Sequence, residues 1–114
     1  MTDVCIFDII CEYKRKVKTK FAILFSWDET KQNSNIKKHG VTFAEASSVF
    51  YDEGAVYLYD DNHSVDEDRF LVIGQSESSG ILLACYCYRK SGEEIRIISA
   101  RKATKNERLL YGGA

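Results

Sequence analysis

Proline is absent from the 114-residue chain and glycine is scarce, which excludes collagen-like and low-complexity sequences. No apolar run approaches the roughly 20 residues that a membrane-spanning helix needs. A secretory signal is not evident, because the apolar stretch 4–11 precedes the basic cluster 14–20, the reverse of the usual order. Hydrophobic residues make up 45% of the chain and charged residues 29%. These features predict one globular domain in the cytoplasm, with no membrane contact.

Charge of one sign is not in excess either, since the formal net charge is -1. The charges are unevenly distributed, however. Residues 1–20 carry five basic and three acidic side chains, 21–68 carry three and ten, and 69–114 carry eight and four. This separation predicts an acidic side and a basic side, and the basic side is the candidate for contacting phosphate.

The four cysteines form no recognisable framework. Cys85 and Cys87 have C-x-C spacing within an apolar run, where a strand would place both on one face as small apolar residues. Structural zinc sites usually need C-x-x-C pairs or a nearby histidine pair. Because His39 and His63 are far apart and neither adjoins a cysteine, we expect core cysteines and no metal site.

The acidic stretch 60–68 begins like a calcium-binding loop, with oxygen-bearing side chains alternating from Asp60. The pattern then fails, since Val65 replaces the required glycine and Leu71 the final glutamate. P-loop, dinucleotide-binding, nucleophile-elbow and zincin motifs are also absent from the sequence. We therefore predict a solvated loop at 60–68 and no cofactor.

The spacing of apolar residues predicts the order of secondary structure. Asp28 can cap a first helix, and Thr42 with Glu45 and Thr104 with Glu107 form capping boxes that open two more. The expected elements are a strand at 21–25, helices at 28–39 and 42–50, strands at 55–59, 70–73, 81–88 and 95–99, and a helix at 104–111. This order predicts a small α+β domain with helices packed on an antiparallel sheet of four to five strands.

The last two long strands are apolar on both faces, which predicts that they lie in the centre of the sheet. Strict alternation would place Ile95 and Ile97 on one face and Ile98 and Ala100 on the other. Residues 1–20 differ in pattern and are interpreted as an N-terminal extension, so the domain is expected at 21–114.

Several basic residues lie on the predicted strands: Arg69 opens one strand, Arg89 closes the next, and the last carries Arg96, Arg101 and Lys102. Strand ends in a meander lie near one another, so Arg69 is expected to converge with the end that carries Arg101 and Lys102. Clustered guanidinium groups suit phosphate, because each planar fork binds two oxygens. The residue pattern alone also permits a second interpretation, in which these residues only solvate the rim of the sheet.

Longer stretches match one known family. They are FSWD at 25–28, KHGVTF at 38–43, EA at 45–46, VFYD at 49–52, DRF at 68–70, IRIISARKAT at 95–104, ER at 107–108 and Tyr111. In order and spacing they resemble the BrnT toxins over residues 25–111. The N-terminal 20 residues have no counterpart there, and Asp68 stands where the family usually has glutamate.

This resemblance implies the toxin half of a type II toxin–antitoxin pair with a RelE-like fold, which cuts RNA and halts translation. It also implies a ribbon-helix-helix antitoxin similar to BrnA, a hetero-oligomer built around an antitoxin dimer, and promoter DNA bound only through that antitoxin. The competing interpretation is a non-catalytic module that sequesters a basic partner of the antitoxin type.

The resemblance and the strand ends together suggest the RNA-binding residues. Arg69 and Arg101 are predicted to stabilise the scissile phosphate, and Ser99, on the strand face of Arg101, to position a phosphate oxygen. Lys102 is expected on the opposite face, as an RNA-backbone contact or a rim charge, and Arg89 is a further candidate for contacting RNA.

Glu67 and His39 are the candidates for acid–base catalysis. His39 has a suitable intrinsic pKa, but it equally fits a charge at the C-terminus of a helix. Glu67 also fits a loop carboxylate that pairs with an arginine. Cleavage by the RNA's own 2′-hydroxyl needs a base, an acid and cations, all of which side chains supply. We therefore predict an endoribonuclease that needs no metal.

Overall fold

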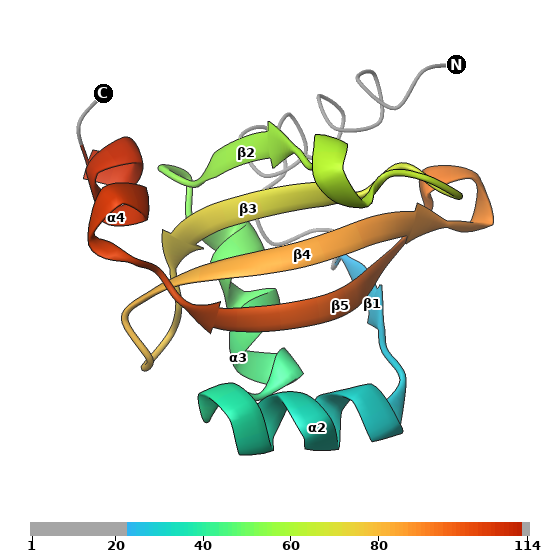
Figure 1. Cartoon of the computed structure of the whole chain (residues 1–114), viewed down its shortest axis with the longest axis horizontal. Helices are drawn as coiled ribbons and strands as arrows, with labels where there is room; N and C mark the ends of the chain where they lie inside the picture. The colour runs from blue at the N-terminus through green and yellow to red at the C-terminus, as the bar shows by residue number, and fades with distance from the viewer. Residues whose placement is uncertain (1–22, 113–114) are drawn as a thin grey trace.

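The fold is a single five-stranded sheet with three α-helices, seen in a computed structural model that describes residues 23–112 (Figure 1). The predicted extension at 1–20 lies outside the described residues. The elements are β1 (Leu24–Ser26), α2 (Glu29–His39), α3 (Phe43–Ser48), β2 (Val56–Tyr59), β3 (Phe70–Gln75), β4 (Ile81–Arg89), β5 (Glu94–Lys102) and α4 (Lys105–Gly112). Short 3₁₀ turns occupy Val49–Tyr51, Asp61–His63 and Lys90–Gly92.

The strand order is β1-β5-β4-β3-β2, in which β2 to β5 form an antiparallel meander. The predicted α+β class is confirmed, as is the central position of the two long strands β4 and β5. Strand β1 pairs with β5 in parallel, with Leu24 opposite Glu94. The sheet is therefore mixed, whereas the sequence predicted antiparallel pairs only.

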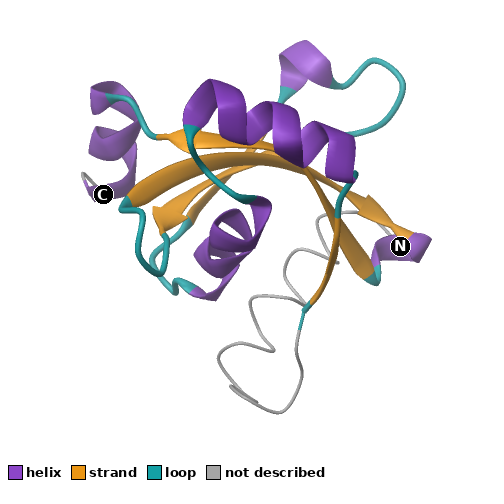
Figure 2. Ribbon diagram, turned by 90° about the horizontal axis from the view of Figure 1, so that it is seen from below, coloured by secondary structure: helices purple, strands orange, loops and turns teal. Residues whose placement is uncertain are grey.

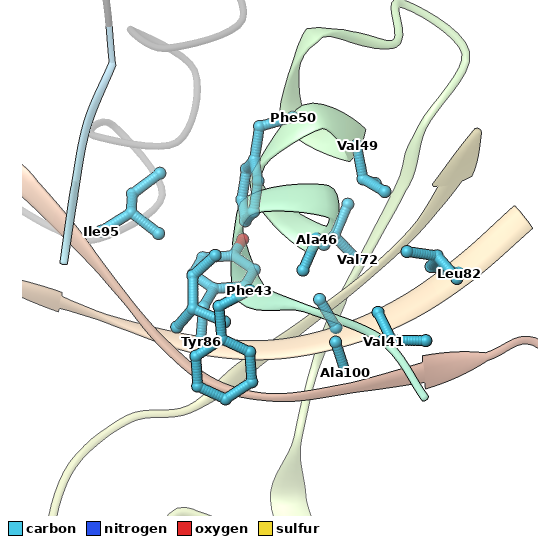
Figure 3. Close-up of a cluster of buried hydrophobic side chains, with 12 residues drawn as sticks. Val41, Phe43, Ala46, Val49, Phe50, Val72, Leu82, Tyr86, Ile95 and Ala100 are labelled. Atoms are coloured by element: carbon cyan, nitrogen blue, oxygen red, sulfur yellow. The ribbon is translucent and has the colours of Figure 1, made fainter. Parts of the chain in front are cut away.

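The main hydrophobic core lies between the sheet and the segment formed by α3 and the following 3₁₀ turn (Figure 2). Phe43, Ala46 and Phe50 are fully buried there, and the Phe50 ring meets Tyr86 of β4 edge to face with 4.9 Å between centroids. Figure 3 shows Phe50 and Tyr86 within this cluster. The opposite face of the sheet, here called the open face, is covered in part by α4 through Tyr111.

Helix α2 lies beside β5 and protects its edge with a polar side chain. Asn35 is 5% exposed, and its Oδ1 accepts from the Ala100 amide at 3.1 Å while its Nδ2 donates to the Ala100 carbonyl at 2.8 Å. The carboxamide thus makes the two backbone hydrogen bonds that a neighbouring strand would otherwise make here. Unpaired backbone groups at a strand edge are prone to pairing with other chains, and at Ala100 they are paired. Asp28 caps the helix, as predicted, and Gly40 ends it in the left-handed conformation at φ 72°.

A β-bulge interrupts β5 and changes which residues face the core. Cys85 of β4 lies opposite Ser99 and Tyr86 lies opposite Ile97, so Ile98 is the extra residue. Ile97 and Ala100 both enter the main core, and Ile98 lines cavities on the open face. The expectation that Ile98 and Ala100 share a face was therefore wrong, because the bulge breaks strict alternation.

The first capping box is only half formed. Thr42 Oγ1 accepts from the Glu45 amide at 3.1 Å, as predicted. The Glu45 carboxylate instead accepts from the Ser78 amide at 2.8 Å, in the β3–β4 connection. This glutamate therefore joins α3 to a distant turn, which the local pattern did not indicate.

Candidate active site

Two cavities adjoin one another on the open face of the sheet. The larger, called here the central cavity, measures about 370 Å³ and is lined by Asp60, Asn62, Arg69, Leu71, Leu83, Cys85, Ile98, Ser99, Arg101 and Glu107. The smaller, called the side cavity, measures about 200 Å³ and is lined by Asp28, Lys31, Glu67, Arg69, Arg89, Arg96, Ile97 and Ile98. Arg69 and Ile98 line both, so the cavities share a wall.

The strand register explains how the central cavity forms. Leu71, Cys85 and Ser99 stand side by side across β3, β4 and β5. Arg69 lies two residues before this row and Arg101 two residues after it, so the arginines enter from opposite sides. Both Arg69 and Arg101 line this cavity, but they lie at opposite ends of the sheet and not at one end, as the prediction assumed.

Arg101 is held rigidly by the first turn of α4. Its Nη1 and Nη2 donate to Glu107 Oε1 and Oε2 at 2.8 and 2.9 Å, a bidentate pair. The same carboxylate accepts from the Thr104 amide at 2.8 Å, and Thr104 Oγ1 accepts from the Glu107 amide at 3.2 Å, which completes the second capping box. The hydrogen bonds from Arg101 lower the pKa of Glu107 to about 2.

Arg69 retains unused hydrogen-bonding capacity. Its Nη2 lies 3.8 Å from Glu67 Oε2, a long ion pair, and about a third of its side chain is exposed. Its Nε is buried and has no hydrogen-bond partner within residues 23–112. A buried donor without a partner is costly, so this guanidinium is suited to an incoming anion.

Glu67 pairs with Arg89, as expected for a loop carboxylate that neutralises an arginine. Arg89 Nη1 donates to Glu67 Oε1 at 2.5 Å and also to the Cys87 sulfur at 3.1 Å. The hydrogen bond from Arg89 is the main cause of a lowered pKa for Glu67, which keeps this carboxylate ionised. An ionised carboxylate beside the cavity can accept a proton, although its lowered pKa makes it a weaker base.

The two cysteines share the open face, as predicted, and both are buried. Burial raises the pKa of Cys85 to about 11 and also raises that of Cys87. Both are therefore neutral thiols at physiological pH and poor nucleophiles. Within the described part of the chain, no three His, Cys, Asp or Glu side chains are grouped so that they could hold a metal ion.

Not all the predicted residues meet at the cavities. Ser99 lines the central cavity and Arg89 the side cavity, but His39 and Lys102 line neither. His39 is exposed in the last turn of α2, and Lys102 is exposed opposite Leu82, which belongs to the main core. The roles suggested for these two residues remain predictions without support from the cavity geometry.

Sequence reasoning missed Asp60 and Lys31, and it noted Arg96 on the last strand without giving it a role in the site. Asp60 is only 8% exposed, and its amide donates to the Arg69 carbonyl at 2.9 Å, which continues the strand pairing. The acidic residues that follow Asp60 led instead to the prediction of a solvated loop. Lys31 follows a helix cap and Arg96 lies on a central strand, positions that would have indicated a shared site only if the β1–β5 pairing were known.

These features define a small α+β protein with an arginine-lined cavity on the open face of its sheet. The sequence profile of the ribonuclease toxin BrnT of type II toxin–antitoxin systems matches residues 27–107. The chain belongs to this family.

The solved structures include a similar fold. The 1.1 Å crystal structure of the Brucella abortus ribonuclease toxin BrnT superposes with a TM-score of 0.57 and 26% sequence identity, covering 74% of this chain and 100% of that one. No curated protein matches the chain. No helix among the described residues is long and apolar enough to cross a membrane.

Proposed function

We propose that this protein is an endoribonuclease toxin that cleaves RNA without a metal ion and inhibits translation. The observation that carries this proposal is the convergence of Arg69, Ser99 and Arg101 on one cavity of a protein from a ribonuclease toxin family. Two guanidinium groups on opposite walls can contact both non-bridging oxygens of one phosphate.

The proposed reaction is attack by the RNA's 2′-hydroxyl on the adjacent phosphorus. Arg69 and Arg101 would stabilise the charge that accumulates on the phosphorane, and the Ser99 hydroxyl would orient one oxygen. Two carboxylates can accept the 2′-hydroxyl proton: Asp60 lines the central cavity, and Glu67 stands beside the shared Arg69. A proton must also reach the leaving 5′-oxygen, which a protonated group or water provides.

The test uses alanine variants expressed in bacteria without an antitoxin. Arg69→Ala and Arg101→Ala should each abolish growth arrest and RNA cleavage, because each removes a cation from the developing charge. Arg108→Ala is the control, since Arg108 is exposed on α4 and lines neither cavity. Circular dichroism checks the fold, and cleavage should persist in EDTA. Full toxicity of both variants would refute the site, and loss of cleavage in EDTA would refute metal independence.

A second candidate function is a non-catalytic module that sequesters a basic antitoxin-type partner. It is favoured by the ion pairs of Arg101 with Glu107 and of Arg89 with Glu67, which neutralise part of the basic face. Expression of the chain alone separates the two functions. A toxin slows growth, whereas a sequestering module leaves growth unchanged.

For the partner we propose a ribbon-helix-helix antitoxin similar to BrnA, in a hetero-oligomer around an antitoxin dimer in the cytoplasm. Promoter DNA would be bound only through the antitoxin. Leu109 and Leu110 of α4 are 61% and 55% exposed, and such adjacent apolar side chains suit a protein interface. The adjacent gene should encode this antitoxin, and the two should co-purify. A monodisperse monomer with no such neighbour would contradict the proposal.

We also propose that the toxin domain begins at residue 21.

A further inference from the structure

The side cavity has a surplus of positive charge, and the proposed cleavage chemistry uses only Arg69 among its basic side chains. It is lined by four basic side chains, which are Lys31, Arg69, Arg89 and Arg96, and by the two carboxylates of Asp28 and Glu67. Three elements supply the cations, since Lys31 comes from α2, Arg89 from the end of β4, and Arg96 from β5. Arg69 precedes β3 and connects this cavity to the central one.

Both carboxylates in the side cavity are already engaged. Asp28 Oδ1 accepts from the backbone amides of Thr30 and Lys31 at 2.8 and 3.1 Å, as the cap of α2. Glu67 accepts the short hydrogen bond from Arg89. These contacts leave little carboxylate capacity for the remaining cations, and the four positive charges exceed the two negative ones.

Two of the cations have capacity to bind a ligand. The Lys31 ammonium forms no ion pair with any residue that the structure describes, and its side chain is exposed. Arg96 is oriented by its Nε, which donates to Ser26 Oγ at 2.8 Å, and its Nη2 lies 3.8 Å from Glu94. A fixed guanidinium beside a free ammonium is an arrangement that favours a phosphate group.

Ile98, the extra residue of the bulge in β5, lines both cavities. Ile98 and Arg69 form the wall that the two cavities share, so the Arg69 guanidinium lines both of them. A strand of RNA presents successive phosphates along its backbone, and a groove lined by cations is the usual way to follow such a backbone. Two adjoining cationic cavities therefore match two neighbouring phosphates.

We propose that the side cavity binds a second phosphodiester of single-stranded RNA, next to the one held in the central cavity. This inference rests on the proposed function for the identity of the ligand. Lys31 is its specific contact, because Lys31 lines only the side cavity and has no competing ion pair among the described residues. The side cavity thereby requires a substrate that extends at least one phosphate beyond the cleaved bond.

The test measures binding without cleavage. Hexanucleotides with 2′-O-methyl groups, which cannot be cleaved by their own hydroxyl, are prepared with one uncharged methylphosphonate at each linkage in turn. Affinities are compared for the wild-type protein, Lys31→Ala, and the control Lys37→Ala. Lys37 lies in the last turn of the same helix and lines neither cavity.

We expect one linkage at which neutralisation weakens wild-type binding about 3- to 10-fold and leaves the affinity of Lys31→Ala unchanged. Lys31→Ala should also reduce the slope of log affinity against log salt concentration by about 0.7, the value for one phosphate contact on a single strand. Lys37→Ala should behave like the wild type in both measurements.

The proposal is overturned if the affinity of Lys31→Ala responds to neutralisation at every linkage as that of the wild type does. It is equally overturned if the control Lys37→Ala shows the same changes as those expected of Lys31→Ala. It is also overturned if Lys31→Ala binds RNA normally but loses the antitoxin, which would assign the cavity to a protein partner. Binding that follows the expected pattern in a protein that cleaves no RNA would refute the ribonuclease proposal alone, so the two failures are distinguishable.

Discussion

The ion pair between Arg101 and Glu107 should have a measurable effect on stability, which Glu107→Gln isolates. Glutamine retains an oxygen that can serve the capping box, so the substitution removes mainly the charge. About a fifth of the Glu107 side chain is exposed and somewhat more than a third of that of Arg101, so solvent screens the pair. A partly exposed bidentate pair is worth about 1 to 2 kcal/mol, and we expect this loss in the free energy of unfolding at pH 7.

The pH dependence of this loss has a definite sign. The pKa of Glu107 is about 2 in the folded protein, below its ordinary value of 4.5. A carboxyl group with a lowered pKa stabilises the fold above its ordinary pKa, and this contribution disappears as the pH falls toward the folded value. The difference in the free energy of unfolding between wild type and Glu107→Gln should therefore have its full size above about pH 6. It should decrease between about pH 4.5 and 2.

Urea unfolding followed by the fluorescence of Trp27 provides the assay, repeated from pH 7 to pH 3. Glu29→Gln is the matched control, because Glu29 also lies in the first turn of a helix but has no arginine partner among the described residues. We expect a change of less than about 0.5 kcal/mol for this control. A Glu107→Gln loss that is the same at pH 7 and pH 3, or no greater than that of the control, would refute the reasoning.

Two further predictions concern the framework of the site, and both are measured as shifts in the urea midpoint. Gly74→Ala should destabilise the protein by about 1 to 3 kcal/mol, because its Cβ would lie 2.7 Å from Val49 Cγ1 and 3.1 Å from Ala55 Cβ; an unchanged midpoint would contradict this close packing. Asn35→Ala should cost about 2 to 3 kcal/mol, because the amide and carbonyl of Ala100 lose their side-chain partner at the edge of β5. A loss below about 0.5 kcal/mol would mean that water replaces the carboxamide.

Local patterns in the sequence predicted the features that depend on neighbouring residues. Asp28 caps α2 as expected, the helix ends at His39 as expected, and the capping box at Thr104 and Glu107 forms completely. The long apolar strands lie in the centre of the sheet. Each of these features is decided within a few residues of the chain, by caps or by burial on both faces.

The features that sequence reasoning missed depend on distant pairing. No local signal indicates that β1 would align in parallel with β5, or that Ile98 would be the extra residue of a bulge. The residues of the candidate site were likewise missed where their position depends on distant pairing. Arg69 and Arg101 were recognised from their places at strand ends together with the family resemblance, whereas Lys31 shares a cavity with Arg69 only because α2 lies beside β5.

The parallel pairing of β1 with β5 has a consequence for the timing of synthesis. Leu24 emerges from the ribosome 70 residues before its partner Glu94. At about 5 to 20 residues per second, β1 therefore waits about 4 to 14 s for the strand that it joins. Ser99, Arg101 and Glu107 emerge later still, so the nascent chain carries no assembled central cavity until residue 107 has been translated. A cell making this protein is thus exposed to a complete cavity only after residue 107 has been translated, several seconds after β1, and any partner made at the same time has that interval in which to appear.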